Sequence, residues 1–150
     1  MSEHPSPASN AGPGGPIQCI SAVTLFTADM GRAVRFYERL GFERRSGGAD
    51  QNFTTFTVGD GALNLAATPR AVRPDWGRII FYVSDVDALY ERARRAGFDP
   101  ESRPRDAPWN ERYFHLNDPD GHQLSFARPL SQRPPVIERG RDRGSGPRSP

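Results

Sequence analysis

The sequence predicts an α+β fold made of two βαβββ modules. A strand-like segment, an Asp, an apolar-periodic segment and a Gly-Phe pair occur twice, 56 residues apart, and the Asp precedes the Gly by 12 residues in both copies. Each copy continues with short segments rich in β-branched and aromatic residues, separated by turn signals. A strand, a helix and three strands that recur in this order indicate one module used twice.

In the first module, residues 22–27 are expected to form a strand. Asp29 is expected to cap the helix that follows, because a short carboxylate accepts the free amide protons of a first helical turn. Gly41 suits the left-handed conformation that ends a helix. Apolar side chains at helical spacing are expected to face the sheet: Met30, Ala33, Val34, Tyr37 and Leu40. Three strands are then predicted: residues 42–45, 53–58 and 62–66.

The second module repeats this pattern from residue 78. Residues 78–83 are expected to form a strand. Asp85 is expected to cap the helix that follows, and Gly97 is expected to end it. Its apolar face is expected to contain Val86, Leu89, Tyr90, Ala93 and Ala96. The later strands are predicted near Phe98, over residues 112–116 and over residues 123–127, and residues 68–76 connect the copies.

These elements define one domain over residues 17–130, with modules at about 17–67 and 77–130. Residues 1–16 and 131–150 hold 8 of the 15 prolines and few apolar side chains, so both are expected to be disordered tails. The last 20 residues carry five Arg against Glu138 and Asp142, which places the net positive charge in a tail. A nucleic-acid-binding surface on the domain is therefore not expected, and no apolar run is long enough for a membrane span. The single Cys19 favours a reducing, cytoplasmic setting, and it is expected to be a small buried residue.

Two sequence motifs carry a family resemblance. Residues 36–42, FYERLGF, lie at the end of the predicted helix of the first module, and residues 118–121, DPDG, precede the last predicted strand of the second. With the duplication, they resemble the glyoxalase, bleomycin-resistance and extradiol-dioxygenase superfamily, also called vicinal oxygen chelate proteins, over residues 17–130. Residues 108–121 look most like the bleomycin-resistance type, which shows a Trp-Gly, an Arg and an aromatic residue before the same turn. Asn110 and Glu111 stand where that family has small residues.

The resemblance also implies where a metal would bind. Family enzymes hold a divalent ion with His or Glu from the first and fourth strands of each copy. The matching positions here are Ala22, Asn64, Arg78 and Ser125. None carries an imidazole or a carboxylate, and the cation of Arg78 would repel a metal. We therefore expect no metal and no other cofactor.

The family fold places the inward strand faces around a pocket in a cupped mixed sheet. Period-two alternation puts Thr24 and Phe26 on one face of the first strand, and Arg78 and Tyr82 on the equivalent face of the fifth. Trp109 is the best candidate for stacking on a planar ligand, ahead of Phe53 and Trp76, and Arg112 could bond a ligand oxygen. The predicted ligand-binding residues are Thr24, Phe26, Asn64, Arg78, Tyr82, Trp109, Arg112 and Ser125. For each of them a purely structural role remains the alternative.

The expected function is metal-free binding of a small organic molecule, with sequestration of an antibiotic or aromatic metabolite as candidate roles. Three observations favour binding over catalysis: the metal ligands are missing, there is no phosphate-binding Gly loop, and no nucleophile has an evident base. A metal-independent lyase or isomerase using Tyr82, Tyr113, His115 or Glu111 is the first alternative. An interaction module using the Arg-rich tail is the second. The exposed edges of a four-stranded half-sheet also predict a homodimer.

Overall fold

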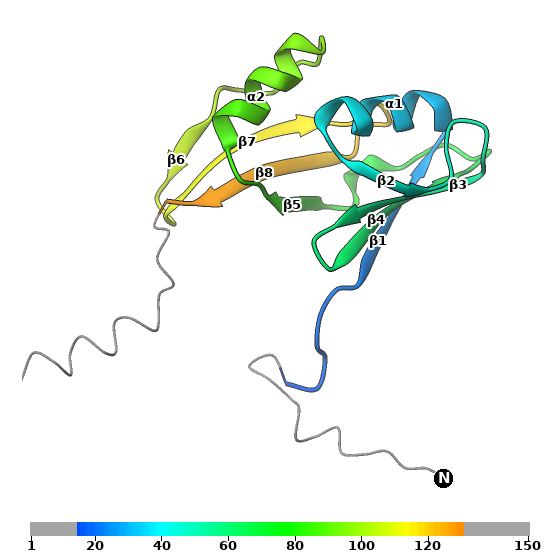
Figure 1. The fold of residues 1–150 in the computed structure, drawn as a ribbon, viewed down its shortest axis with the longest axis horizontal. Helices are drawn as coiled ribbons and strands as arrows, with labels where there is room; N and C mark the ends of the chain where they lie inside the picture. The colour runs from blue at the N-terminus through cyan, green and yellow to red at the C-terminus, as the bar shows by residue number, and fades with distance from the viewer. Residues whose placement is uncertain (1–14, 131–150) are drawn as a thin grey trace, which may run out of the picture. The chain divides into compact units, whose positions relative to one another are not determined.

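A strand, a helix and three strands follow one another twice along residues 15–130, the part of the chain that the computed structural model describes (Figure 1). The predicted α+β class with two βαβββ modules is confirmed. Residue contacts divide the chain into two compact units between Val72 and Arg73, and each unit contains one module. Apart from Gly15 and Pro16, the predicted tails lie outside the described residues.

The first module contains β1 (Ala22–Thr27), α1 (Met30–Leu40), β2 (Glu43–Ser46), β3 (Phe53–Val58) and β4 (Gly61–Ala67). Its sheet has the order β1-β4-β3-β2, in which β1 runs parallel to β4 and the other pairs are antiparallel. The predicted caps are confirmed. The carboxylate of Asp29 accepts from the amide of Arg32 at 3.0 Å, and Gly41 ends the helix with φ 107°. The five predicted apolar residues of α1 are all buried, together with Phe36.

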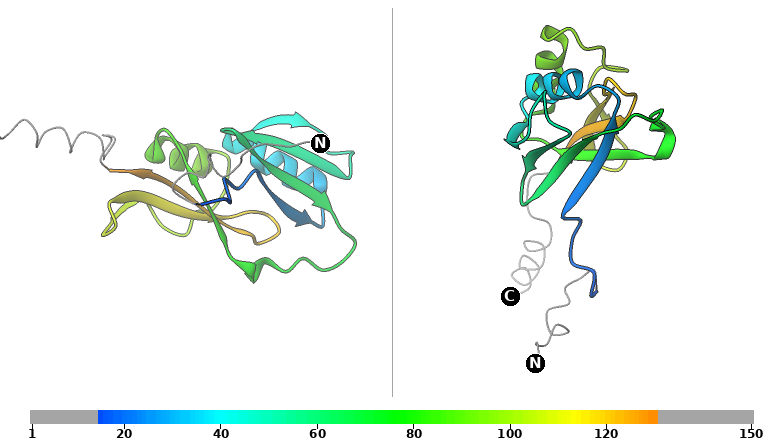
Figure 2. Two further views of the ribbon diagram at one scale, coloured as in Figure 1. Left: turned by 90° about the horizontal axis from the view of Figure 1, so that it is seen from below. Right: turned by 90° about the vertical axis from the view of Figure 1, so that its right-hand side faces the viewer.

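The second module has the same topology. It contains the short 3-10 helix η2 (Pro74–Trp76), β5 (Arg78–Tyr82), α2 (Val86–Arg95), β6 (Arg105–Ala107), β7 (Glu111–Asn117) and β8 (Gln123–Pro129), and its sheet has the order β5-β8-β7-β6. Asp85 caps α2 by accepting from the amide of Ala88 at 3.0 Å, and Gly97 follows the helix with φ 90°. Each helix covers one face of its own sheet, as the views in Figures 1 and 2 show.

Two expectations about this part of the chain were wrong. The second strand of the second module is β6, not a segment near Phe98. It was missed because it is a three-residue edge strand, Arg-Asp-Ala, without any β-rich signal. On the predicted apolar face of α2, only Val86 and Ala93 are fully buried, and Leu89, Tyr90 and Ala96 are half-buried. Cys19 is exposed and precedes β1 instead of lying in the core. Neither helix among residues 15–130 has the length and apolar character that crossing a bilayer requires.

Candidate functional site

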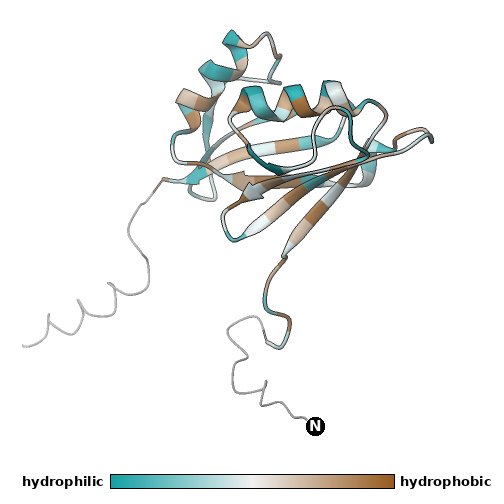
Figure 3. Ribbon diagram, turned by 45° about the vertical axis from the view of Figure 1, so that its right-hand side comes forward, coloured by the Kyte–Doolittle hydropathy of each residue, from teal (hydrophilic) through white to brown (hydrophobic). Residues whose placement is uncertain are grey.

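Each sheet has one face against its helix and one open face. Along β1 and β5 the more buried side chains alternate with exposed ones. Several of the exposed positions are apolar, so both strands contain hydrophobic segments, drawn in brown in Figure 3. The open faces carry large apolar side chains: Phe26 and Phe53 on the first sheet are 56% and 49% exposed, and Tyr82 on the second is 64% exposed. Large apolar side chains exposed to solvent on a sheet face are typical of a surface that binds a ligand or another protein.

The open face of the first sheet is uncharged along its three long strands. In one row Phe26 of β1 lies opposite Ala66 of β4, which lies opposite Phe53 of β3. The next row is hydrogen-bonded across the sheet. The hydroxyl of Thr55 donates to Oδ1 of Asn64 at 2.9 Å, and Nδ2 of Asn64 donates to the hydroxyl of Thr24 at 3.1 Å.

The open face of the second sheet has the same strand pairing as that of the first but carries different side chains. Tyr82, Ala127 and Tyr113 form the row that corresponds to Phe26, Ala66 and Phe53. Ile80, Ser125 and His115 form the next row, and Arg78 lies opposite Gln123 at the end of β5. The guanidinium of Arg78 is exposed and donates to the amide oxygen of Gln123 at 2.9 Å, and it forms no ion pair with residues 15–130. Its charge is therefore available to a ligand.

Trp109 lies at the other end of this face, in the turn between β6 and β7. Asn110 adopts the left-handed conformation with φ 70°, which Asn tolerates better than most residues, so the turn forms without the family's small residue. The indole stacks on Tyr113 with ring centroids 5.8 Å apart and an interplanar angle of 28°. Trp109 is nevertheless 63% exposed, which leaves ring surface for a ligand.

Glu111 links the exposed side chains of Tyr82 and Trp109 through hydrogen bonds. It accepts hydrogen bonds from the Tyr82 hydroxyl and, at 3.1 Å, from Nε1 of Trp109. The hydrogen bond to Glu111 raises the pKa of Tyr82, and partial burial and the negative charge of that carboxylate act in the same direction. Tyr82 therefore stays a neutral phenol at physiological pH. Because Glu111 is occupied by these two donors, it does not neutralise Arg78.

His115 stands between the charged and aromatic parts of this face. Burial lowers the pKa of His115, the positive charges of Arg78 and Arg105 lower it further, and Glu101 acts in the opposite direction. The imidazole is thus neutral at pH 7. Its Nδ1 atom is buried and has no hydrogen-bond partner among residues 15–130.

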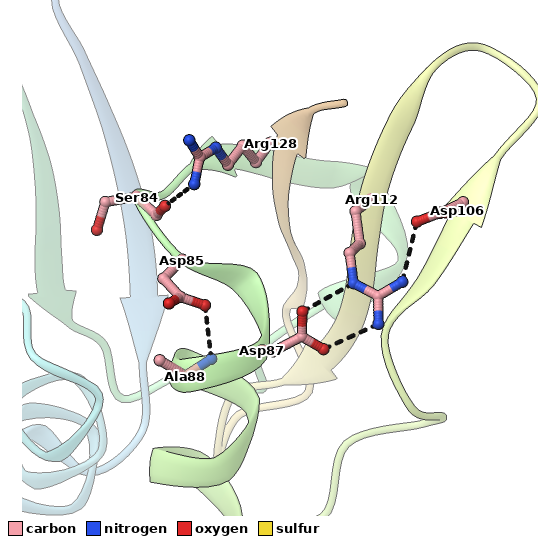
Figure 4. Close-up of polar contacts among 7 residues, drawn as sticks. All are labelled: Ser84, Asp85, Asp87, Ala88, Asp106, Arg112 and Arg128. Atoms are coloured by element: carbon pink, nitrogen blue, oxygen red, sulfur yellow. Dashed lines mark hydrogen bonds and ion pairs between the residues drawn. The ribbon is translucent and has the colours of Figure 1, made fainter. Parts of the chain in front are cut away.

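Arg112 does not belong to the open face. Phe114, two residues along β7, packs against Tyr90 of α2, and Arg112 lies on the same face of the strand. The guanidinium makes two hydrogen bonds to the carboxylate of Asp87 on α2, at 2.8 and 2.9 Å, and one to Asp106 on β6 at 2.9 Å (Figure 4). Arg112 therefore joins helix to sheet, and we remove it from the ligand-binding set.

Arg78 and Trp109 are farther apart than the sequence interpretation assumed. Arg78 lies opposite Gln123, whereas Tyr113, on which Trp109 stacks, lies opposite Ala127. Four residues of strand separate those rows, or about 13 Å at 3.3 Å per residue. A molecule that contacts both side chains must therefore be longer than a single ring.

The comparisons with known proteins decide the family. Residues 20–126 match the model of the Glyoxalase/Bleomycin resistance protein/Dioxygenase superfamily. The chain belongs to this superfamily. A search of the curated proteins gives no significant match.

Several solved structures resemble the chain. A glyoxalase/bleomycin resistance protein/dioxygenase from Nocardioides is 26% identical, with 79% of this chain and 87% of that chain covered and a TM-score of 0.59. TioX from Micromonospora sp. ML1 is 29% identical, with 75% and 100% covered and a TM-score of 0.61. A bleomycin-binding protein complexed with bleomycin is 25% identical, with 74% and 98% covered and a TM-score of 0.59.

The positions at which superfamily enzymes bind a metal do not suit one here. Ala22 has no donor atom, Arg78 is a cation, and Asn64 and Ser125 offer only neutral oxygens, of which Asn64 is already hydrogen-bonded and Ser125 is buried. A divalent ion needs several imidazole or carboxylate donors that converge. Among residues 15–130, no three His, Cys, Asp or Glu side chains are grouped in a way that could hold such an ion.

The structure brings the other predicted residues together in two groups. Thr24, Phe26 and Asn64 share the open face of the first sheet, and Arg78, Tyr82, Trp109 and Ser125 share that of the second or its adjoining turn. Sequence reasoning gave no ligand-binding role to Ala66 and Ala127, although their place between aromatic side chains follows from strand alternation once the pairing is known. Nor did it assign Arg105, which lies over the Tyr113 ring at 5.5 Å.

Proposed function

We propose that this chain is a metal-free, small-molecule-binding protein of the superfamily, and that its second module binds an elongated planar molecule with an acidic or carbonyl end. The observation that carries the proposal is the open face of the second sheet. It combines the available charge of Arg78 with the exposed rings of Tyr82 and Trp109, separated by roughly 13 Å. The bleomycin complex of one relative supports ligand binding as the general function. Sequestration of an antibiotic is one role this would serve.

The proposed ligand follows from the chemistry of the face. Arg78 favours a carboxylate, phenolate or carbonyl oxygen at one end, where Gln123 is its present acceptor. Tyr82 and Trp109 favour a conjugated ring system at the other end. Ser125 lies between them on β8. An extended polycation would be repelled by the positive charge of Arg78.

A binding experiment with matched probes tests this. Anthraquinone-2-carboxylate has three fused rings and one acidic end, whereas benzoate has the acid and a single ring. We expect the first to quench tryptophan fluorescence and raise the melting temperature, and the second to bind far more weakly. Arg78→Gln should weaken anthraquinone-2-carboxylate binding by about 1.5 kcal/mol, roughly tenfold, at the lower end for a charged hydrogen bond because the side chain is exposed.

The controls separate a specific site from general charge attraction. Trp109→Leu should cost about 1 kcal/mol if one ligand face stacks on the indole. Arg95→Gln removes an equal charge from the end of α2 and should leave affinity unchanged. If bleomycin binds tightly and anthraquinone-2-carboxylate does not, the role assigned to Arg78 is wrong. One tightly bound metal ion per chain in elemental analysis would refute the metal-free proposal.

A metal-independent lyase or isomerase is the second candidate, favoured by His115. This imidazole is neutral, has an unpartnered buried Nδ1 among residues 15–130, and lies opposite Ser125 on the proposed ligand-binding face. A neutral imidazole can accept a proton from a bound carbonyl compound. Mass spectrometry of any ligand after incubation decides between the two functions. Turnover that disappears in His115→Gln while binding persists would establish catalysis.

A homodimer remains part of the proposal, and the sheet edges support it. In each sheet one edge strand is short and charged: β2 reads Glu-Arg-Arg-Ser and β6 reads Arg-Asp-Ala. The opposite edges, β1 and β5, are rich in β-branched and aromatic residues and carry a single charge, on Arg78. Such edges favour pairing with another strand. Light scattering at tens of micromolar should give twice the chain mass, and a monomer would contradict this.

The cytoplasmic location stays a prediction.

A further inference from the structure

We propose that the first module binds an uncharged planar ring that carries a carbonyl or ring-nitrogen acceptor, held between Phe26 and Phe53 above Ala66. The inference rests on the proposed small-molecule-binding function, and it adds a second ligand class and a place for it. The site is formed within one module, by three neighbouring strands, β1, β4 and β3.

The spacing of the strands suits one ring between two. Phe26 and Phe53 stand on strands that flank β4, so their backbones are separated by about 9.6 Å, twice the usual strand spacing. A flat ring stacked between two others needs about 7–8 Å between them, at 3.5–4 Å for each contact. Ala66, which lies between them in register, has only a methyl group and retains some exposure to solvent. Phe53 makes no ring contact of its own among the described residues, and about half its surface is exposed.

The neighbouring row supplies hydrogen-bond donors to the edge of such a ring. It lies two residues along β4, about 7 Å away. Asn64 uses one N–H to donate to Thr24, and within residues 15–130 its second N–H and the Thr24 hydroxyl proton have no acceptor. Both are donors, so the ligand atom that they suit is an acceptor.

The absence of charge sets the ligand class apart from that of the second module. No ionisable residue stands on this face in β1, β4 or β3, whose open-face residues are Ala22, Thr24, Phe26, Ala62, Asn64, Ala66, Phe53, Thr55 and Thr57. Placing a carboxylate there would remove water from a charge without offering a cation in return. The first module should therefore prefer neutral rings, whereas the second prefers acidic ones.

Coumarin, a flat neutral lactone of two fused rings, is the test probe, and its saturated analogue octahydrocoumarin is the matched control. Binding to the full chain is followed by amide chemical shifts. Coumarin should shift the amides of Phe26, Phe53 and Ala66, and octahydrocoumarin should not. Ala66→Leu fills the space between the rings and should weaken coumarin binding roughly tenfold or more, the value expected for losing two ring contacts. Ala62→Leu makes the same change two rows away, between Ala22 and Thr57, and should have little effect.

The outcomes separate this inference from the proposed function. Phe53→Leu, which keeps an apolar side chain, should also weaken coumarin binding, so the test does not depend on Ala66→Leu folding normally. Coumarin binding should not respond to Arg78→Gln, and anthraquinone-2-carboxylate binding should not respond to Ala66→Leu. If coumarin binds Phe53→Leu and Ala66→Leu as tightly as the unmodified chain, the inference is wrong, whatever the result with the acidic probe. If only the acidic probe fails, the second-module proposal is wrong and the neutral site stands.

Discussion

The two modules share one topology but are stabilised differently. In the first, α1 buries six side chains, and Tyr37 packs edge-on against Phe36 and Phe42 with ring centroids 5.0 and 5.1 Å away. In the second, α2 buries only Val86 and Ala93, and its link to the sheet includes the ion pairs of Arg112. The two copies of the fold thus differ chiefly in how much of the helix is buried against the sheet.

The open faces differ in a related way. The row Phe26, Ala66 and Phe53 is neutral and leaves Ala66 partly exposed. In the matching row of the second module, Ala127 is 1% exposed, and the flanking Tyr82 and Tyr113 are fixed by contacts to Glu111 and Trp109. The second face therefore carries charged side chains that contact its rings, whereas the three long strands of the first face carry none there. This difference is the basis for proposing that the two faces bind different ligands.

The largest expected effect concerns the two helix tyrosines. Tyr37→Ala should destabilise the protein by about 3–5 kcal/mol, because the ring is fully buried among other aromatic side chains. Tyr90→Ala should cost about 1–2 kcal/mol, since Tyr90 is only half-buried and makes one edge contact, with Phe114. Urea denaturation followed by circular dichroism measures both values. Equal losses would show that α2 is packed as tightly as α1.

Much of this difference was not visible in the sequence. Helical spacing gives the direction of an apolar face, and it identified the faces of both helices, but it does not give the depth of burial. Leu89 and Tyr90 are on the predicted face and are only half-buried. The edge strand β6 was missed because its three residues have no strand pattern, and its position depends on pairing with β7.

The candidate site was partly predictable for a similar reason. Alternation correctly placed Thr24 with Phe26 on one face of β1, and Arg78 with Tyr82 on one face of β5, because successive side chains of a strand point to opposite faces. The same rule applied to β7 would have put Arg112 on the face of Phe114 and Leu116, and so against the helix. The separation of Arg78 from Trp109 required the register of β5, β8 and β7, which no single segment contains.

The helix caps give a second, smaller test of the comparison. Asp29→Ala and Asp85→Ala each remove a carboxylate that accepts one amide proton at 3.0 Å, and each should cost about 1 kcal/mol. The length of helix that becomes more dynamic should differ between the two variants. Because α2 has less burial to hold it, we expect amide hydrogen exchange to speed up along the whole of α2 in Asp85→Ala, but only in the first turn of α1 in Asp29→Ala. Asp29→Asn and Asp85→Asn keep an acceptor and should be nearly neutral.

The smallest effect concerns the ion pairs that join each helix to its sheet. In the first module Arg44 donates to Glu38 of α1 at 2.7 Å, and in the second Arg112 bonds Asp87 and Asp106 (Figure 4). All these side chains are at least a third exposed, so solvent screens them. Arg112→Met should lower the free energy of unfolding by about 0.5–1 kcal/mol, because it removes two hydrogen bonds to Asp87 and the contact with Asp106. Arg44→Met should lower it by about half as much. Both losses should shrink in 1 M salt.

The pH dependence of this contact has a defined sign. The hydrogen bonds from Arg112 lower the pKa of Asp87 below its usual value, with the positive charge acting the same way. A carboxyl group whose pKa is lower in the folded state stabilises the fold at pH values above the unfolded pKa of about 4, and this contribution is lost as the pH falls further. The difference in urea midpoint between the unmodified protein and Asp87→Asn should therefore be present at pH 7 and disappear near pH 3. A difference that is unchanged at pH 3 would mean that Asp87 holds α2 through its helix position and not through its charge.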